Sequence, residues 1–322
     1  MTSTPVDDAT LALLLEVAGT PKPGNVDRRR DLDDLRFEAF LGGAVGARRG
    51  LELAADEEAE IGRAFERGVA GMAARAGTNT QFGCLLLLVP LVRATVAEGE
   101  AGGALSPAGV DRVTRAATVD DAVSFYRAFE HVDVAVADPP TDAAALDVRR
   151  GSDAAPALRE RDATLRDVMA LSADPAGSGG SDDTERVPDR NAQEWVEGFP
   201  RTFRAAEWIR GDEGPLTDRA ARAFLGLLAG EPDTLVAANH GPETAREVSD
   251  RVAALLGRDG ADSDGSTAGS GVDAAAVHGA DLEAAEELAA AFADEGVNPG
   301  TTADITCAAL YVALRRGAEV AP

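Results

Sequence analysis

Lysine is almost missing from this chain of 322 residues, because Lys22 is the only lysine among 31 basic residues. Histidine and cysteine are also scarce, with three and two copies, and neither type stands at the spacing of a zinc site. Aromatic residues make up only 4% of the chain, so its core must consist mainly of Ala, Leu and Val. The two cysteines, Cys84 and Cys307, are predicted to be buried thiols in a reducing cytoplasm.

Long apolar runs are missing as well. The longest, at 84–92, contains Pro90 and falls well short of the roughly 20 residues that span a bilayer. The leucine-rich run at 11–15 is short and follows two aspartates, which is not the pattern of a signal peptide. We therefore expect a soluble, cytoplasmic protein without a membrane partner.

Acidic residues outnumber basic ones, 56 against 31, and the net charge is −25. The charges are spread along the whole chain, which favours adaptation to strong salt, where repulsion is screened over ~3 Å at 1 M ionic strength. An acidic protein that binds a basic partner is the alternative. No basic face outweighs the acid, so nucleic acid is excluded as an expected partner.

Apolar residues recur at helical spacing along most of the chain. In 35–53, for example, Phe37, Leu41, Ala44 and Leu51 fall on one side of a helix. Strand-like alternation is confined to 131–136. The sequence therefore predicts an all-α fold, with further helices at 8–17, 57–74, 82–97, 120–129, 192–209, 217–228, 242–256, 281–293 and 302–315.

Three stretches are rich in Gly, Ser, Asp and Pro, near 138–156, 174–189 and 258–273. Such segments cannot bury apolar surface, so we interpret them as polar loop insertions in a single multi-helix globular domain spanning 1–322. Domain linkers are the alternative. Candidate functional motifs lie on both sides of all three stretches, however, and would have to converge on one site.

Lys22 lies in a turn between two prolines, in the segment Thr-Pro-Lys-Pro-Gly-Asn-Val-Asp at 20–27, and arginines follow at 28–30. The prolines restrain the backbone, and the four cations form a local positive spot that suits a polyphosphate. Asp27 and Asp31 suit the Mg²⁺ that such a ligand carries. A solvated turn whose charges pair with one another is the alternative.

A second motif, 77–83, places small polar residues ahead of an apolar helix. The side chains of Asn79 and Thr80, together with free backbone N–H groups, could hold an anion or a ribose. Ordinary helix capping by the same side chains is the better interpretation of this motif alone.

A third motif, 298–304, also opens an apolar helix and contains Asn298 and Asp304. Asp304 could be a metal ligand or a carboxylate near a reacting sugar, or it could form a capping box with Thr301. A weaker segment begins at Glu194 and continues to Pro200. The chain has no P-loop and no dinucleotide-binding glycine pattern.

Taken together, these segments resemble the triphosphoribosyl-dephospho-CoA synthase family, of the CitG/MdcB type. Their order and rough spacing cover about 11–314, and the combination is specific although each segment alone is weak. The resemblance rests on Thr20-Pro21-Lys22-Pro23-Gly24-Asn25-Val26-Asp27, Asn79-Thr80 with Gly83, Glu194 with Gly198-Phe199-Pro200, and Asn298-Pro299-Gly300 with Ala303-Asp304.

The resemblance implies an all-helical enzyme that breaks the adenine–ribose bond of ATP, joins the triphosphoribosyl group to the 2′-hydroxyl of 3′-dephospho-CoA and releases adenine. A carboxylate would stabilise the oxocarbenium charge at C1, and a second would take the proton of the hydroxyl. Glu194 and Asp304 are the candidates, with their order undecided. The other implied site residues are Lys22 on the triphosphate, Asn79 on the ribose, Asn25, Thr80 and Asn298 as further ATP contacts, and Asp27 and Asp31 on Mg²⁺.

The chain departs from the bacterial pattern at three places, which indicates a divergent, archaeal-like branch. Gln81-Phe82 stands where those members tend to read His-Lys, and Arg30 stands where they tend to carry a histidine. Ala192-Gln193-Glu194 replaces the Arg-Gly-Glu that precedes their Gly-Phe-Pro. Two other functions therefore stay open, a nucleotide-binding or sensing protein without catalysis and a hydrolase that cleaves the same bond. We expect small-molecule substrates, and the oligomeric state is open, a homo-oligomer included.

Overall fold

The computed structural model describes residues 3–100, 102–136, 141–173, 187–257 and 272–320. In this part of the chain there are α-helices and two short 3₁₀ helices but no β-strand, which confirms the all-α prediction. The helices, in chain order, are α1 (Pro5–Ala18), α2 (Phe37–Ala54), α3 (Ile61–Ala76), α4 (Phe82–Glu100), α5 (Pro107–Arg115), α6 (Val119–Ala128), η1 (Thr141–Leu146), η2 (Val148–Ala154), α7 (Ala155–Glu160), α8 (Leu165–Ala173), α9 (Arg190–Glu197), α10 (Pro200–Gly211), α11 (Leu216–Gly230), α12 (Thr234–His240), α13 (Pro242–Leu255), α14 (Ala274–His278), α15 (Leu282–Asp294) and α16 (Gly300–Arg315).

Helical periodicity located the longer helices to within a few residues, but it did not predict the shorter α7, α8, α12 and α14. The predicted helix at 192–209 is two helices, α9 and α10, because Gly198 and Phe199 both have positive φ angles and Pro200 begins a new helix. The candidate strand at 131–136 is not a strand. The apolar pattern gave no clear signal for the corner at 198–200 or for the irregular backbone at 131–136.

The polar stretches have different outcomes. Part of 138–156 was wrongly predicted as a loop, because η1, η2 and the start of α7 lie in it. Most of 174–189 and 258–273 lies outside the described residues. A single hydrophobic core draws residues from both ends of the chain, from Val6 to Ala313, while the extent of the domain stays a prediction.

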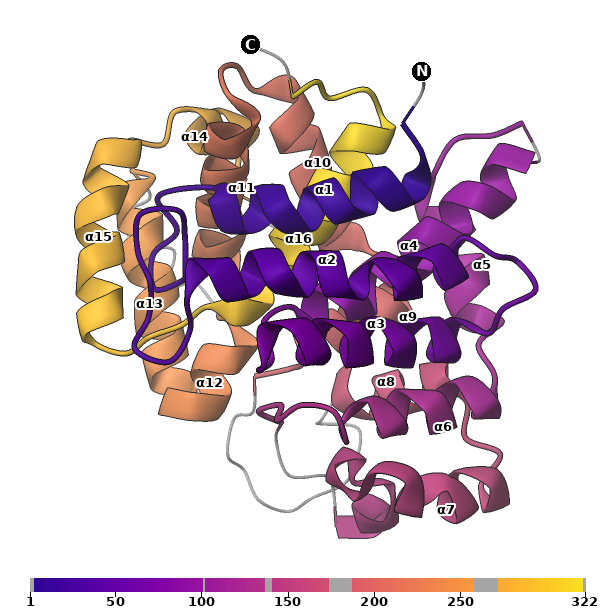
Figure 1. Cartoon of the computed structure of the whole chain (residues 1–322). Helices are drawn as coiled ribbons and strands as arrows, with labels where there is room; N and C mark the ends of the chain where they lie inside the picture. Colours follow the sequence, from indigo (N-terminus) through magenta and orange to yellow (C-terminus); the bar gives the residue numbers. More distant parts are fainter. Residues whose placement is uncertain (1–2, 101, 137–140, 174–186, 258–271, 321–322) are drawn as a thin grey trace.

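Helix α16 runs through the middle of the molecule and contacts α1, α4, α9, α10, α11 and α12 (Figure 1). Its last turn ties down the N-terminus, where Arg315 donates to the Ser3 carbonyl at 3.0 Å and to Asp8 at 2.7 Å. Among the described helices, α4 alone is long and apolar enough to cross a membrane by length and composition. About two thirds of that window is buried against other helices, 67%, so core packing accounts for its hydrophobicity.

Helices α2 and α3 lie side by side at very short range (Figure 1). A Cβ atom at Gly46 would overlap the carbonyl oxygen of Gly71, and one at Gly50 would overlap the backbone of Gly68. Glycine on both helices therefore lets the backbones touch. The close contact positions α2 and α3, and α4, which begins with the polar motif, packs against both helices.

Candidate active site

The turn at Lys22 is buried rather than solvated. Lys22 is 1% exposed, and its Nζ forms an ion pair with Glu16 on α1. Burial raises the pKa of the Glu16 carboxyl group, and the nearby ammonium opposes that effect. The charges of this turn are thus paired inside the protein, and a contact between Lys22 and a triphosphate stays a prediction.

Asp27 holds the same turn together. Its Oδ1 accepts hydrogen bonds from the backbone N–H groups of Arg29 and Arg30, at 2.8 and 3.0 Å. Its Oδ2 accepts from Thr20 Oγ1 at 2.8 Å and from the backbone N–H of Lys22 at 3.4 Å. Asp27 is fully buried, so both oxygens serve the turn itself.

The two predicted magnesium ligands face different surroundings. The side chain of Asp31 is 41% exposed and accepts a hydrogen bond from the backbone N–H of Phe37 at 2.7 Å, whereas Asp27 is enclosed. In the part of the chain that the structure describes, no group of three or more His, Cys, Asp or Glu side chains could hold a metal ion. Asp27 and Asp31 therefore do not fit a magnesium site built by the protein alone, and their metal binding stays a prediction.

The Lys22 turn packs directly on the closing motif, about 270 residues further along the chain. Gly24 has φ +77°, and a Cβ atom there would overlap the carbonyl oxygen of Val297 and lie 2.9 Å from Cδ of Pro299. Next to this contact, Asn25 is 7% exposed and its Nδ2 has no hydrogen-bond partner, while Asn298 is half-buried. Two of the motifs thus meet, as the sequence required.

Asp304 lies where the second and third motifs meet. A Cβ atom at Gly83, in the first turn of α4, would overlap Oδ2 of Asp304 and lie 2.7 Å from Nδ2 of Asn191. Asn191 Nδ2 donates to Asp304 Oδ2 at 2.9 Å, and Cys84 Sγ donates to Oδ1 at 3.2 Å. The predicted capping box with Thr301 is wrong, since α16 has no side-chain cap at its N-terminal residue and the carboxylate turns toward α4 and α9.

The environment of Asp304 raises its pKa to about 7. Burial is the main cause, and the negative charges of Glu16 and Asp233 add to it, while the hydrogen bonds from Asn191 and Cys84 oppose it. A carboxyl group that ionises near neutral pH can take up and release a proton under ordinary conditions. Its half-buried position leaves it partly open to solvent.

The two cysteines, distant in the sequence, interact beneath Asp304. Both thiols are free and buried, as predicted. The pKa of Cys84 is raised well above its ordinary value, first by the hydrogen bond with Cys307 and then by burial, and burial also raises the pKa of Cys307. Protonated thiols are poor nucleophiles, so Cys84 serves as a donor to Asp304.

Some side chains of the 77–83 motif cap helix α4, and others face the core. Asn79 Oδ1 accepts from the backbone N–H of Phe82 at 3.2 Å, which confirms the capping interpretation. Thr80 Oγ1 and Gln81 Oε1 are buried without a partner in the structure. The ring of Phe82 packs edge-on against Phe65 at 5.0 Å between centroids, so this position faces the core.

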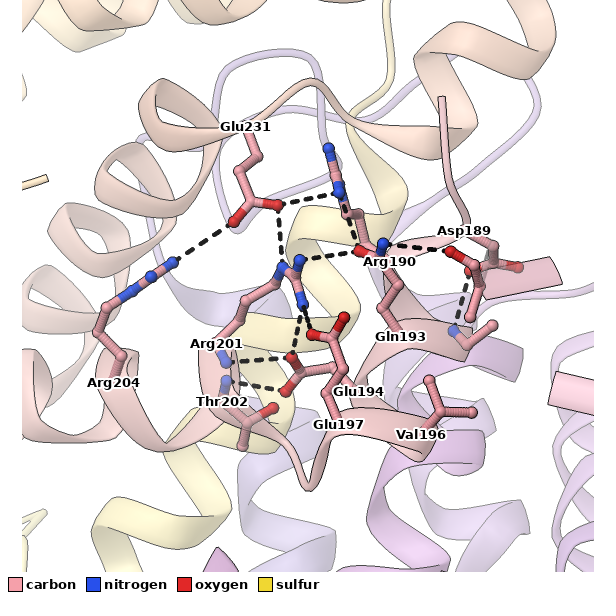
Figure 2. Close-up of polar contacts among 12 residues, drawn as sticks. Asp189, Arg190, Gln193, Glu194, Val196, Glu197, Arg201, Thr202, Arg204 and Glu231 are labelled. Carbon is pink, nitrogen blue, oxygen red and sulfur yellow. Dashed lines mark hydrogen bonds and ion pairs between the residues drawn. The ribbon is translucent and has the colours of Figure 1, made fainter. Parts of the chain in front are cut away.

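Glu194 is enclosed at the corner between α9 and α10 (Figure 2). Its Oε1 accepts from the backbone N–H of Arg201 at 3.0 Å, and its Oε2 accepts from that of Thr202 at 2.9 Å. Phe199, the residue before α10, gives no side-chain cap, so Glu194 satisfies these N–H groups instead. Glu194 is 0% exposed, and its role as a carboxylate near the sugar stays a prediction.

Three arginines converge beside this corner and were not singled out from the sequence. The arginine cluster consists of Arg190, Arg201 and Arg204, and all three point toward Glu231 (Figure 2). They line a small cavity of about 20 Å³ together with Asp233, Thr301 and Thr302, among other residues. Arginine is common in this chain, so no local pattern distinguished these three positions from surface arginines.

Asn191 was also missed, because an asparagine at the start of a helix is usually a cap. It links the two parts of the site: its amide holds Asp304, and the preceding residue, Arg190, belongs to the arginine cluster. Its own Oδ1 is buried without a partner. The structure thus brings Asp304, Gly83 and the Lys22 turn together around α16, and it places Glu194 and Asn79 in capping positions.

An all-helical scaffold that holds a carboxyl group with a raised pKa near a cavity lined by arginines suits acid–base chemistry on an anionic substrate. Residues 2–321 match the sequence model of the CitG family, described as ATP:dephospho-CoA triphosphoribosyl transferase. The chain belongs to this family, and its activity is triphosphoribosyl transfer from ATP to dephospho-CoA. This confirms the resemblance read from the four sequence segments.

A solved structure supports the same fold. A proposed triphosphoribosyl-dephospho-CoA synthase from Archaeoglobus fulgidus superposes with a TM-score of 0.61 and is 21% identical in sequence. The match covers 86% of this chain and 99% of the archaeal one. A search among curated proteins gave no match.

Proposed function

We propose that Asp304 is the group that takes the proton from the acceptor hydroxyl during triphosphoribosyl transfer. The observation that carries this proposal is a half-buried carboxyl group with a pKa of about 7, held by Asn191 and Cys84 where the sequence motifs meet. A base is most effective when its pKa lies near the working pH. Among the two carboxylates considered, Asp304 has this property, while Glu194 is enclosed by its cap contacts.

The reaction exchanges one bond at C1 of the ribose. The C1–N bond to adenine breaks, a C1–O bond to the acceptor hydroxyl forms, the hydroxyl proton passes to Asp304, and adenine leaves with the bond electrons and takes up a proton. The negative charge of the ionised Asp304 also stabilises the positive charge that develops at C1. One residue at this position can therefore assist both bond changes.

Unpartnered polar groups in the sequence motifs and at Asn191, which holds Asp304, support binding of a polar ligand. The buried atoms Asn191 Oδ1, Asn25 Nδ2 and Thr80 Oγ1 have no partner in the described structure. Buried polar groups are normally satisfied, so each of these atoms could accept or donate a hydrogen bond to a bound ligand. We assign Asn25, Thr80 and Asn191 to the ATP and acceptor contacts, with Asn79 and Asn298 at the edge of the same site.

Lys22 has a different role in this proposal. Because its ammonium is paired with Glu16 and both side chains are 2% exposed, it stabilises the turn that meets Val297 and Pro299. Mg²⁺ would arrive with ATP, held mainly by phosphate oxygens and waters, since magnesium usually takes only one or two carboxylates from a protein. Buried free thiols are consistent with a cytoplasmic location.

The experiment is a product assay on the purified protein. With Mg-ATP, adenine should appear only when dephospho-CoA is present, together with an adduct heavier by one triphosphoribosyl group. Adenine without an acceptor would indicate hydrolysis instead, and ATP binding without adenine in either tube would indicate a non-catalytic protein. Mass spectrometry of both products distinguishes the three outcomes.

A further inference from the structure

We infer that the arginine cluster is the polyphosphate subsite of the enzyme and that Glu231 occupies it as a replaceable anion. This inference rests on the proposed function for the identity of the natural ligand, ATP. It assigns the triphosphate to Arg190, Arg201 and Arg204 and not to Lys22.

Three guanidinium groups converge on one carboxylate, that of Glu231 (Figure 2). Glu231 Oε2 lies 3.1 Å from Arg190 Nη1 and 3.0 Å from Arg201 Nε, and its Oε1 lies 3.8 Å from Arg204 Nη2. Arginine binds phosphate through planar, paired N–H groups, so a cluster of this kind matches a polyphosphate. Glu231 is the carboxylate that all three arginines share, while Glu194 and Glu197 pair with Arg201 as well.

Two of the arginines meet uncharged groups besides Glu231: Arg190 Nη1 donates to Oε1 of Gln193 at 2.9 Å, and Arg204 lies over the ring of Trp208. In the described part of the chain, Arg190 and Arg204 form ion pairs with Glu231 alone, while Arg201 also contacts Glu194 and Glu197. Nε of Arg190 is buried and has no hydrogen-bond partner. An unsatisfied guanidinium N–H in a cavity wall is a donor available to an incoming oxygen anion.

The cavity beside the arginine cluster lies close to Asp304 along the chain. Thr301 and Thr302 line it from the first turn of α16, and Asp304 lies two to three residues further along the same helix, within one helical turn. Arg190 lines it from α9, and the next residue, Asn191, holds Asp304. A triphosphate bound at the cluster would therefore present its ribose toward Asp304.

The size of the cavity shows why an exchange is required. Its volume of about 20 Å³ is room for a water molecule but not for a phosphate group. Glu231 is 29% exposed and follows the end of α11, so its side chain can swing outward. Asp233, which also lines the cavity, uses its oxygens on the N–H groups of α12 and on Thr302, and stays in place.

Inorganic tripolyphosphate is the probe that tests this subsite apart from catalysis. Its affinity should be measured by calorimetry for the full-length protein and for the variants Arg190→Ala, Arg204→Ala and Glu231→Gln. We expect each arginine variant to lose about tenfold in affinity and Glu231→Gln to gain about tenfold, the scale of one charge-assisted hydrogen bond. Arg204 is 39% exposed, so its variant keeps the buried contacts of the corner.

Arg251→Ala and Glu295→Gln are the matched controls, because these residues form a partly exposed ion pair of 2.7 Å on another part of the protein. Neither should change the affinity. Unchanged binding in both arginine variants, or weaker binding in Glu231→Gln, would overturn the inference. Failure of Asp304 as the base would leave these affinities unaffected, so the two proposals fail separately.

Discussion

At the residue scale, the site depends on a few polar side chains whose neighbours change their chemistry. Asp304 is the clearest case, because burial and nearby negative charge raise its pKa to about 7. Asn191 and Cys84 hold its two oxygens in place. None of this environment was visible in the sequence, where Asp304 was one of two candidate carboxylates.

The first prediction concerns the pH dependence of the reaction. Because the base must be ionised, kcat/KM for adenine formation should rise with pH through about 7. Cys84→Ala removes a hydrogen bond that lowers the pKa of Asp304, so its midpoint should move to higher pH. Cys84→Ser keeps a donor and should stay closer to the parent profile. An unchanged midpoint in Cys84→Ala would show that the Cys84 thiol does not affect the pKa of Asp304.

The same pKa has a consequence for stability. The folded protein keeps the Asp304 proton to a higher pH than the unfolded chain does, because the folded pKa is raised from 3.8 to about 7. This residue therefore lowers stability as the pH rises through that interval.

The second prediction concerns Glu194. Glu194→Ala should lower the free energy of unfolding by about 3–5 kcal/mol, because it leaves the backbone N–H groups of Arg201 and Thr202 without a partner and removes a buried carboxylate that pairs with the Arg201 guanidinium. Glu197→Ala, one turn away with a side chain 45% exposed, should cost less than about 1 kcal/mol. Urea unfolding measures both. Equal, small costs for the two variants would contradict the capping role.

At the element scale, α16 is the helix on which the site is assembled. It receives the Lys22 turn at its N-terminal approach, α4 at Gly83, and α9 at Asn191 (Figure 1). Segments from the start, the first third, the middle and the end of the chain thus meet on one helix. The order of the motifs in the sequence carries no trace of this arrangement.

The third prediction tests the contact between the first turn and the closing motif. Gly24→Ala adds a Cβ at φ +77° that overlaps the carbonyl oxygen of Val297, so it should cost about 3 kcal/mol or more and separate the two motifs. Gly257→Ala is the matched control, because φ is +70° and nothing lies within 4 Å of the added Cβ. It should cost only about 1–2 kcal/mol. Thermal unfolding and adenine formation should both distinguish the two variants.

Much of the fold followed from the sequence, because helical periodicity is a local property that burial reinforces. The corner between α9 and α10 was missed, since the apolar pattern of 192–209 continues through Gly198 and Phe199. The capping box at Thr301 was a plausible local pairing that a tertiary contact, between Asp304 and Asn191, replaced. Periodicity records which face is buried, but it does not record where the chain turns.

The candidate site was predicted less completely. Asp304 and the Lys22 turn were found from spacing, whereas Asn191 and the arginine cluster were not. Their function depends on partners more than 100 residues away for Asn191 and on Glu231 for the arginines. Such pairings arise only when the helices are assembled.

At the scale of the whole molecule, charge is the dominant feature. A net charge of −25 on 322 residues makes the compact state repel itself at low ionic strength. Many arginines are committed to carboxylates within the fold, so the excess of negative charge lies on the surface. The electrostatic potential therefore differs between the site, where charges are paired, and the negatively charged surface.

The fourth prediction follows from this surface. The thermal unfolding midpoint should rise as KCl increases from about 0.1 M to about 1 M, since the screening length falls from ~10 Å to ~3 Å. Sucrose at equal osmolality is the control for effects of solvent exclusion. A midpoint that is independent of KCl, or that falls, would contradict adaptation to salt.

The most direct test of the central claim is the rate of adenine formation from Mg-ATP and dephospho-CoA by Asp304→Asn. Asp294→Asn, an exposed aspartate on α15, is the matched control, and circular dichroism confirms that both variants are folded. The account predicts a loss of about 10²-fold or more for Asp304→Asn, the range of general-base catalysis, and an unchanged rate for the control. A folded Asp304→Asn that forms adenine at the parent rate would show that the proton goes elsewhere.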